Sequence, residues 1–178
     1  MKGCDAVINV AGNYSFWEKD NSVFYRTNVE GTRHVMEAAL ETGVFKAIHI
    51  SAVGIWGKVS HSPFNEDTPP ANERFGIYFD SKFAGDQQAW ALAQRGLPLV
   101  IVYPCSVIGP NDQSAGGAYV QNLIREKLPA IVFPDAVLPY VDVDDVANAI
   151  VLALEKPNNI GEKYIVGKHH LSLKDYGE

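Results

Sequence analysis

The chain has 178 residues, of which 47% are hydrophobic and 20% are charged, a size and composition typical of one soluble globular domain. Its 15 basic and 21 acidic residues give a net charge of -6, and no run of Lys and Arg offers a stripe for a phosphate backbone, so we expect no nucleic-acid partner. No apolar run approaches the roughly 20 residues of a membrane span and the first residues lack a leader pattern. We therefore expect a cytoplasmic protein with no membrane contact.

Cysteines and histidines show no pattern of a disulfide framework or a metal site. Cys4 and Cys105 lie far apart in the sequence without a partner motif. The five histidines include the neighbours His169 and His170, but none has the i, i+4 spacing with acidic neighbours of a helical metal site. We expect no bound metal.

Strands and helices alternate along the first half of the chain. Residues 6–10 (AVINV) and 47–51 (AIHIS) are short β-branched runs that predict buried strands. Residues 22–42 between them carry apolar side chains at helical spacing, with Asn21 or Ser22 as the N-cap and Gly43 as the stop.

The alternation continues to the end of the chain. Residues 77–95 predict a helix that ends at Gly96, and residues 99–103 (LVIVY) predict a strand buried on both faces. The later predictions are a helix at 115–127, short extended pieces at 130–141, a helix at 143–156 introduced by Asp142, a strand at 163–166 and the start of a helix at 171–176.

This order of elements predicts an α/β fold with right-handed crossovers and a parallel sheet covered on both sides. In such sheets, ligands bind beyond the carboxyl ends of the strands. Gly12, residues 51–54 and residues 104–106 all follow predicted strands, so we expect them to meet at one crevice. The long Pro-containing loop at 57–76 precedes the helix at 77–95, and loops of that length are usually functional or mobile.

Tyr78 and Lys82 form the candidate catalytic pair of this sequence. Their four-residue spacing on a helix brings a phenol and an ammonium together. A free phenol has a pKa of about 10, so base chemistry near neutral pH requires a close positive charge, which Lys82 can supply. The alternative is a tyrosine and a lysine on a solvated helix face.

This pair lies in one of six segments that follow one another in a fixed order: residues 5–12 (DAVINVAG), 27–32 (TNVEGT), 49–51 (HIS) with Gly57 closing the loop, 78–82 (YFDSK), 103–110 (YPCSVIGP) and 141–147 (VDVDDVA). In kind and order they resemble the extended short-chain dehydrogenase/reductase family, the superfamily of NAD-dependent epimerases and dehydratases. With residues 161–167 (GEKYIVG), the later segments are more similar to its dihydroflavonol-reductase-like branch than to its sugar-nucleotide branch. The resemblance implies a Rossmann-like sheet.

The resemblance also implies an activity and a set of site residues. Tyr78 would be the general acid/base that exchanges a proton with a hydroxyl or keto group of a small-molecule substrate, Lys82 its electrostatic partner, and Ser51 a helper. NAD or NADP would be the cofactor, and a homodimer is compatible with the family. The implied cofactor-binding residues are Ala11, Gly12, Ser51, Tyr78, Lys82, Pro104, Cys105, Ser106 and Val107. Asn28 is as readily structural as catalytic.

Two departures from the family limit this prediction. The family's catalytic hydroxyl is usually the second residue of a Ser-Ser or Ser-Thr pair, and Ala52 stands at that position, after Ser51. Loss of such a donor costs about 10²-fold or more in rate. A non-catalytic member that binds a nucleotide or a partner protein is therefore the alternative, and a small α/β protein with an unrelated function is a third.

The second departure is a missing phosphate-binding turn. The family begins with a strand and a Gly-rich turn that places pyrophosphate at a helix N-terminus, and no such segment occurs in residues 1–178. We expect residues 1–178 to be the C-terminal portion of an NAD(P)-binding Rossmann domain, with part of a small substrate-binding region at about 111–140 and 158–178, and to be inactive in isolation.

Overall fold

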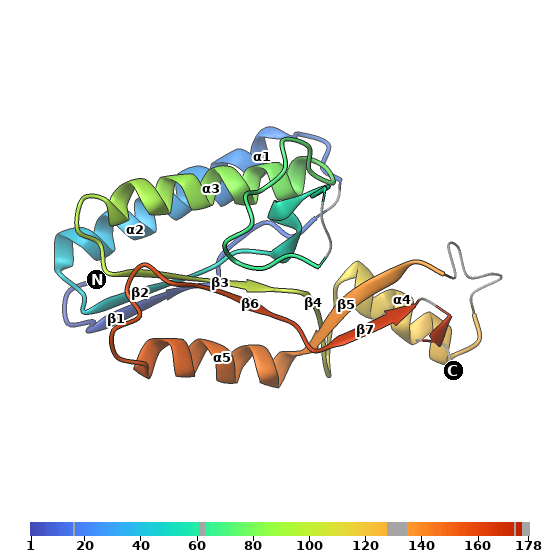
Figure 1. The fold of residues 1–178 in the computed structure, drawn as a ribbon. Helices are drawn as coiled ribbons and strands as arrows, with labels where there is room; N and C mark the ends of the chain where they lie inside the picture. Colours follow the sequence, from blue (N-terminus) through green and yellow to red (C-terminus); the bar gives the residue numbers. More distant parts are fainter. Residues whose placement is uncertain (16, 61–62, 128–134, 173, 176–178) are drawn as a thin grey trace. The chain divides into compact units, whose positions relative to one another are not determined.

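A sheet of four strands organises the first of two structural units. The computed structural model describes residues 1–15, 17–60, 63–127, 135–172 and 174–175, and it divides into Met1–Tyr103 with Ile150–Ile165, and Pro104–Ala149 with Val166–Glu178. The sheet has the order β1-β2-β3-β6, formed by β1 (Ala6–Asn9), β2 (Lys46–Ile50), β3 (Leu99–Pro104) and β6 (Lys163–Val166) (Figure 1). The β1/β2 and β2/β3 pairs are parallel, with Ala6 opposite Lys46 and Ala47 opposite Leu99. The predicted α/β class and these strands are confirmed.

The helical run between β1 and β2 contains a π-helical segment. α1 (Ser22–Tyr25) continues into the π-helix η1 (Arg26–Gly31) and then into α2 (Thr32–Thr42). The run ends at Gly43, whose φ of 67° is the left-handed conformation that glycine adopts at little cost. The predicted helix is thus confirmed, while its π segment was not predicted; such segments often lie at functional sites.

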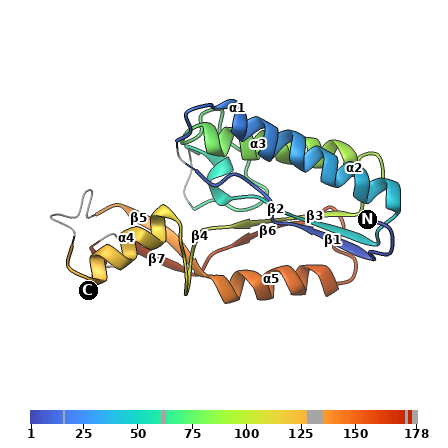
Figure 2. The ribbon, with the colours of Figure 1, turned by 180° about the vertical axis from the view of Figure 1, so that it is seen from behind.

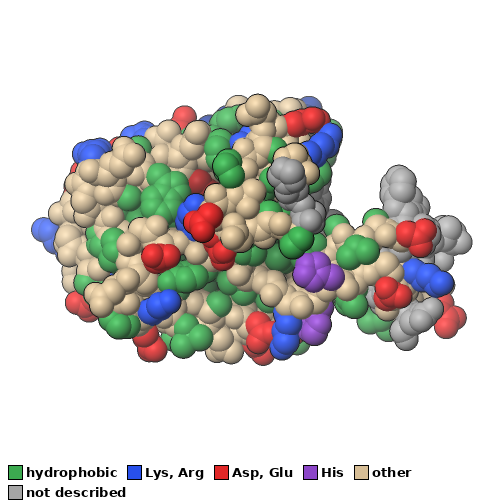
Figure 3. Space-filling model, in the orientation of Figure 1, with side chains coloured by type: hydrophobic (Ala, Val, Ile, Leu, Met, Phe, Trp, Pro, Cys, Tyr) green, Lys and Arg blue, Asp and Glu red, His purple; other side chains and the backbone are tan. Residues whose placement is uncertain are grey.

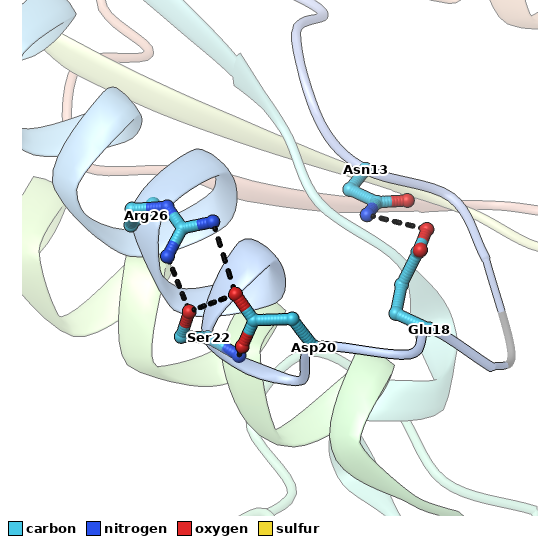
Figure 4. Close-up of polar contacts among 5 residues, drawn as sticks. All are labelled: Asn13, Glu18, Asp20, Ser22 and Arg26. Carbon is cyan, nitrogen blue, oxygen red and sulfur yellow. Dashed lines mark hydrogen bonds and ion pairs between the residues drawn. The ribbon is translucent and has the colours of Figure 1, made fainter.

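The N-terminal end of this helical run is capped by Asp20, which was not among the predicted N-cap residues. Asn21 makes no side-chain cap hydrogen bond, whereas the Asp20 carboxylate accepts from the Ser22 backbone N–H at 2.9 Å and from the Ser22 hydroxyl at 2.8 Å. Arg26 lies one turn along and contacts both side chains (Figure 4). Asp20 therefore satisfies an N–H group that the helix itself leaves unpaired.

Helices cover both faces of the sheet. The run α1-η1-α2 and the helix α3 (Ile77–Ala93) lie on one face, and residues 150–155 of α5 (Val143–Glu155) lie on the other (Figures 1 and 2). Every residue of β2 and β3 is buried, as expected for strands covered on both sides. The core beneath α2 and α3 includes Met36, Ala39, Ile55, Trp56, Ala89, Leu92, Leu99, Ile101 and Tyr103.

The loop at residues 57–76 is tied to this core. The indole N–H of Trp56 donates to the carbonyl of Thr68 at 2.7 Å, and the Trp56 ring packs edge-on against Tyr103 with centroids 4.7 Å apart. Arg74 Nε donates to the carbonyl of Ile55 at 3.0 Å. These bonds satisfy backbone oxygens that a loop would otherwise leave to water.

A second sheet organises the other unit. Its order is β4-β5-β7, formed by β4 (Ser106–Ile108), β5 (Val137–Asp142) and β7 (His169–Ser172), with β4/β5 parallel and β5/β7 antiparallel. The predicted helix at 115–127 is present as α4 (Ala115–Ile124). Part of the extended region predicted at 130–141 lies outside the described residues, and the rest contains β5.

The predicted helix start at 171–176 is wrong at its first two residues. Leu171 and Ser172 belong to β7, and Leu171 pairs with Leu138 of β5. Hydrogen bonds across the sheet decide the conformation, because a short run of apolar residues fits a strand as well as a helix. No helix in the described part of the chain is long and apolar enough to cross a membrane.

Candidate active site

Helix α3 places Tyr78 and Lys82 together at its N-terminal end. The helix begins after Gly76, whose φ of 120° lies in a region that L side chains rarely adopt. Both side chains are buried, with Tyr78 9% exposed and Lys82 5% exposed, so the alternative of a solvated pair does not describe them. The Tyr78 ring packs edge-on against Tyr14 from the loop after β1, with centroids 5.3 Å apart.

Lys82 joins α3 to the end of β2. Its Nζ donates to the carbonyl oxygen of Ile50 at 2.7 Å. Gly12, which follows β1, lies so close that an added Cβ would sit 3.7 Å from Lys82 Nζ and 3.3 Å from Asn28 Oδ1. The first two loops expected at the site therefore lie beside the lysine, as predicted for the carboxyl ends of neighbouring parallel strands.

Burial shifts the pKa values of both candidate catalytic groups toward their neutral forms. It lowers the pKa of the Lys82 ammonium, and the nearby Asp86 carboxylate opposes that shift. It raises the pKa of the Tyr78 phenol well above its ordinary value, with further increases from Tyr14 and Asp86. Tyr78 is therefore a protonated phenol at neutral pH, and burial acts in the direction opposite to the lowering of its pKa by Lys82 that we expected from the sequence.

Ser51 contacts a carboxylate that sequence reasoning missed. Its Oγ donates to Asp86 Oδ2 at 2.8 Å, and both residues are buried. A hydroxyl has one proton, so Ser51 can accept a further hydrogen bond but cannot donate one while this bond stands. Ala52, the next residue, is extended with φ −153° and ψ 142° and carries no hydroxyl.

A buried histidine lies on the other side of Asp86. The His49 Nε2 atom lies 3.2 Å from Asp86 Oδ1, with poorer alignment than a normal hydrogen bond, and His49 Nδ1 lies 3.2 Å from Asn9 Nδ2. Burial lowers the pKa of His49, so its imidazole is neutral at neutral pH. Asp86 lies four residues after Lys82 on the same helix. This spacing is the signal in the sequence that could have identified it.

Asn28 has a structural role in this arrangement. Its amide donates to Ser81 Oγ at 2.9 Å and accepts from the Asn13 backbone N–H at 2.7 Å, and Ser81 Oγ in turn donates to the carbonyl of Tyr78 at 2.7 Å. Asn13 also donates to Glu18 at 3.0 Å (Figure 4). Asn28 therefore fixes the loop after β1 to α3 by hydrogen bonds within the protein.

The remaining predicted residues belong to the second unit. Pro104 ends β3, Ser106 and Val107 lie in β4, and Cys105 between them is 9% exposed. Burial raises the pKa of the Cys105 thiol, which therefore stays protonated at neutral pH. This unit also has an open hollow of about 320 Å³ whose lining includes Ile108, Asp112, Val120 and Asp142.

The face in Figure 3 shows no basic stripe, and no metal-ligand cluster is seen among the described side chains. No group of three or more His, Cys, Asp or Glu residues among them is arranged to hold a metal ion. On the face in Figure 3, Lys and Arg side chains lie scattered among acidic ones and form no basic stripe.

The fold and the buried Tyr78–Lys82 pair define a Rossmann-like α/β protein. The sequence profile of the NAD dependent epimerase/dehydratase family matches residues 1–167, and the chain belongs to that family. It is 32% identical over 182 residues to a Synechocystis protein named "Putative dihydroflavonol 4-reductase", covering 98% of this chain and 52% of that protein.

Solved structures have the same fold. The crystal structure of gox2253 has a TM-score of 0.88 and 38% identity, covering 99% of this chain and 54% of that one. UDP-glucuronic acid 4-epimerase from Bacillus cereus, in complex with NAD, has a TM-score of 0.86 and 26% identity, covering 98% of this chain and 58% of that one. The chain thus spans little more than half the length of these proteins.

Proposed function

We propose that the chain carries the catalytic pair of an NAD(P)-dependent oxidoreductase, epimerase or dehydratase that acts on a hydroxyl or keto group of a small molecule. The observation that carries the proposal is the burial of Tyr78 and Lys82 one turn apart, with Lys82 Nζ bound to the end of β2 and close to Gly12. Family membership and the NAD in a similar epimerase structure support the cofactor.

The residues present fit a dinucleotide at this point. Gly12 leaves open the space that a Cβ would fill between Asn28 Oδ1 and Lys82 Nζ, as a close backbone approach requires. Ala11, Gly12, Ser51, Tyr78 and Lys82, which all belong to the first unit, would hold the nicotinamide half. When bound, the cofactor supplies or accepts the hydride.

Tyr78 and Lys82 have separate tasks in this proposal. The protonated phenol of Tyr78 gives its proton to the carbonyl oxygen of the substrate during reduction, and takes it back in the reverse direction. Its raised pKa keeps the phenol protonated at neutral pH, which is the form that can donate, and also makes it a weaker acid. The Lys82 ammonium stabilises the phenolate that remains, since an opposite charge nearby favours the charged form.

The catalytic assignment lacks a free hydroxyl donor for the developing negative charge on the substrate oxygen. Position 52 has no hydroxyl, and Ser51 donates its proton to Asp86. This observation favours a second candidate, a family member that binds a nucleotide or a partner protein without turnover. Under either candidate, residues 1–178 alone should bind a dinucleotide weakly, because they contain no Gly-rich strand-turn-helix segment.

Substitution of Tyr78 distinguishes the two candidates. In the natural protein that contains this sequence, Tyr78→Phe removes the transferable proton but keeps the ring that packs on Tyr14. We expect turnover of a keto substrate with NAD(P)H to fall about 10²-fold or more while the cofactor Kd stays unchanged. No turnover in the wild-type protein would favour the binding candidate. Equal turnover in wild type and Tyr78→Phe would instead show that Tyr78 is not the catalytic acid/base.

Titration of residues 1–178 with NADH, followed by nicotinamide fluorescence, tests the expected inactivity in isolation. We expect no saturation in the micromolar range. Micromolar affinity would show that NADH binding does not require the Gly-rich phosphate-binding turn.

A further inference from the structure

Asp86 lies on the same face of α3 as the two candidate catalytic residues. Tyr78, Lys82 and Asp86 follow one another at four-residue intervals, and successive positions of this spacing stack along one side of a helix. All three are buried, with Asp86 only 3% exposed. A carboxylate so far from water is costly unless groups around it compensate its charge.

Two polar side chains at the end of β2 lie next to the Asp86 carboxylate and reduce the cost of its burial. Ser51 Oγ donates to Oδ2 at 2.8 Å, and His49 Nε2 lies 3.2 Å from Oδ1. The amide nitrogen of Asn9 can only donate, so His49 Nδ1 accepts from it, and the one proton of the neutral imidazole is on Nε2, which lies near Asp86 Oδ1 without the alignment of a normal hydrogen bond. Neither neighbour carries a positive charge at neutral pH.

The basic side chain near Asp86 is that of Lys82, one turn earlier on the same face of the helix. Burial favours neutral Lys82, and the Asp86 charge favours the ammonium. The other titratable groups influenced by Asp86 are Tyr78 on α3, His49 on β2 and Tyr103 on β3. All three are uncharged at neutral pH, so Lys82 is the group whose charge Asp86 stabilises.

We propose that Asp86 is a positioning residue of the candidate site, which holds the Ser51 hydroxyl at the end of β2 and serves as the buried counter-charge of Lys82. This inference rests on the proposed function of the Tyr78–Lys82 pair. It assigns the carboxylate no contact with substrate or cofactor. The proposed role gives a reason for a carboxylate at position 86, four residues after Lys82, on a helix face that packs into the core.

The ionisation of Lys82 tests this proposal without substrate or cofactor. In the 178-residue chain with ¹³C-labelled lysines, the Cε resonance of Lys82, assigned by its loss in Lys82→Met, reports its titration midpoint. We expect Asp86→Asn to move that midpoint to lower pH, and Asp86→Glu to return it toward the wild-type value. A folded Asp86→Asn protein with an unchanged midpoint would overturn the proposal, whatever the result of the Tyr78→Phe experiment.

Two control variants separate charge from packing. Asp80→Asn removes the same charge from α3 at a side chain that is 47% exposed and paired with Arg74, and should leave the Lys82 midpoint in place. Ser51→Ala removes the hydrogen bond to Asp86 but keeps the carboxylate, and should also leave it in place. A shift in Ser51→Ala as large as that in Asp86→Asn would contradict the counter-charge assignment.

A stability comparison covers the case in which Asp86→Asn does not fold. If Asp86 compensates the charge of Lys82, the double variant Lys82→Met with Asp86→Asn has no uncompensated buried cation. It should give more folded protein and a higher Tm than Asp86→Asn alone. A double variant no more stable than the single one would overturn the proposal.

Discussion

The Nζ atom of Lys82 in α3 donates a 2.7 Å hydrogen bond to the carbonyl oxygen of Ile50, the last residue of β2. This bond fixes the helix that carries Tyr78 to the strand end that carries Ser51. The lysine therefore contributes to the geometry of the site as well as to its charge. The predictions below concern the contacts that hold this arrangement in place.

The close approach of α3 to η1 depends on Gly85. A Cβ at this position would collide with the backbone oxygen of Asn28, so Gly85→Ala forces the two helices apart. Overpacking of this kind costs about 1–3 kcal/mol, which exceeds the gain of about 1 kcal/mol in helix propensity. We expect a lower free energy of unfolding by urea denaturation.

The matched control for Gly85→Ala is Gly116→Ala in α4. There the added Cβ would meet only Ser114 Oγ at 3.4 Å and Asp112 Oδ2 at 4.0 Å, which are ordinary contacts. This variant should be as stable as the wild type or slightly more so. Equal effects at the two positions would contradict the steric explanation.

Lys46 holds the C-terminal end of α5 against β2. Its buried Nζ donates to the carbonyl oxygens of Ala153, Leu154 and Lys156 at 2.7–3.1 Å and to Asn159 Oδ1 at 2.7 Å. Lys46→Met removes this donor from all four acceptors, while Ala153 O keeps the hydrogen bond from the Asn159 amide, so we expect a loss of about 2–3 kcal/mol in the free energy of unfolding. A cation at this point also interacts favourably with the helix dipole.

Lys58→Met is the surface counterpart of Lys46→Met. Lys58 pairs with Glu73, but both side chains are more than half exposed, and such pairs contribute little to stability. Chemical denaturation should place this variant close to the wild type. If Lys46→Met were equally neutral, the buried hydrogen bonds would have no net effect on stability.

His49 should make the protein less stable in acid. Burial holds its pKa in the folded protein below the ordinary value of about 6.5, so between those two pH values the unfolded chain binds more protons. Stability is thus fully present above pH 6.5 and is lost as the pH falls toward the folded-state pKa. Urea midpoints measured from pH 7.5 to 5 should fall less in His49→Gln than in the wild type.

Substitution of an exposed histidine controls for general effects of charge. His34 is exposed on α2, and His34→Gln should leave the pH dependence of the urea midpoint unchanged. An identical dependence in wild type and His49→Gln would mean that other groups cause the acid sensitivity.

Ala52→Ser restores a hydroxyl at the position where the family usually has one. The extended backbone of Ala52 accepts serine without strain. If the proposed reaction occurs, kcat should rise by up to about 10²-fold, because a missing oxyanion donor is supplied. Ala52→Val adds bulk without a donor and should give no gain. Equal kcat values in wild type and Ala52→Ser would indicate that another donor already acts.

The sequence predicted the parts of the site that have a local signal. The four-residue spacing of Tyr78 and Lys82 requires only a helix, and the strand ends at Gly12 and Ser51 follow from short apolar runs. Together with the ordered segments, they identified the family. These features depend on near neighbours in the chain, which is why periodicity and spacing reveal them.

Other features were missed because their partners are distant in sequence. Asp86 and Ser51 are 35 residues apart, and the π-helical turn at η1 leaves no mark in the hydrophobic spacing of residues 22–42. Leu171 joins a strand because it pairs with Leu138, while its immediate neighbours suggest a helix equally well. Hydrogen bonds between distant segments determine the contact of Asp86 with Ser51 and the strand conformation of Leu171.

The sequence by itself determined the α/β class, the family and the identity of the candidate catalytic pair, because these depend on local periodicity and on ordered motifs. The tertiary structure decided the electrostatics of that pair. Burial raises the pKa of Tyr78, and the carboxylate of Asp86, brought to the end of β2 by the packing of α3, opposes the loss of charge on Lys82. Desolvation and distant charges exist only after folding, so no local pattern encodes them.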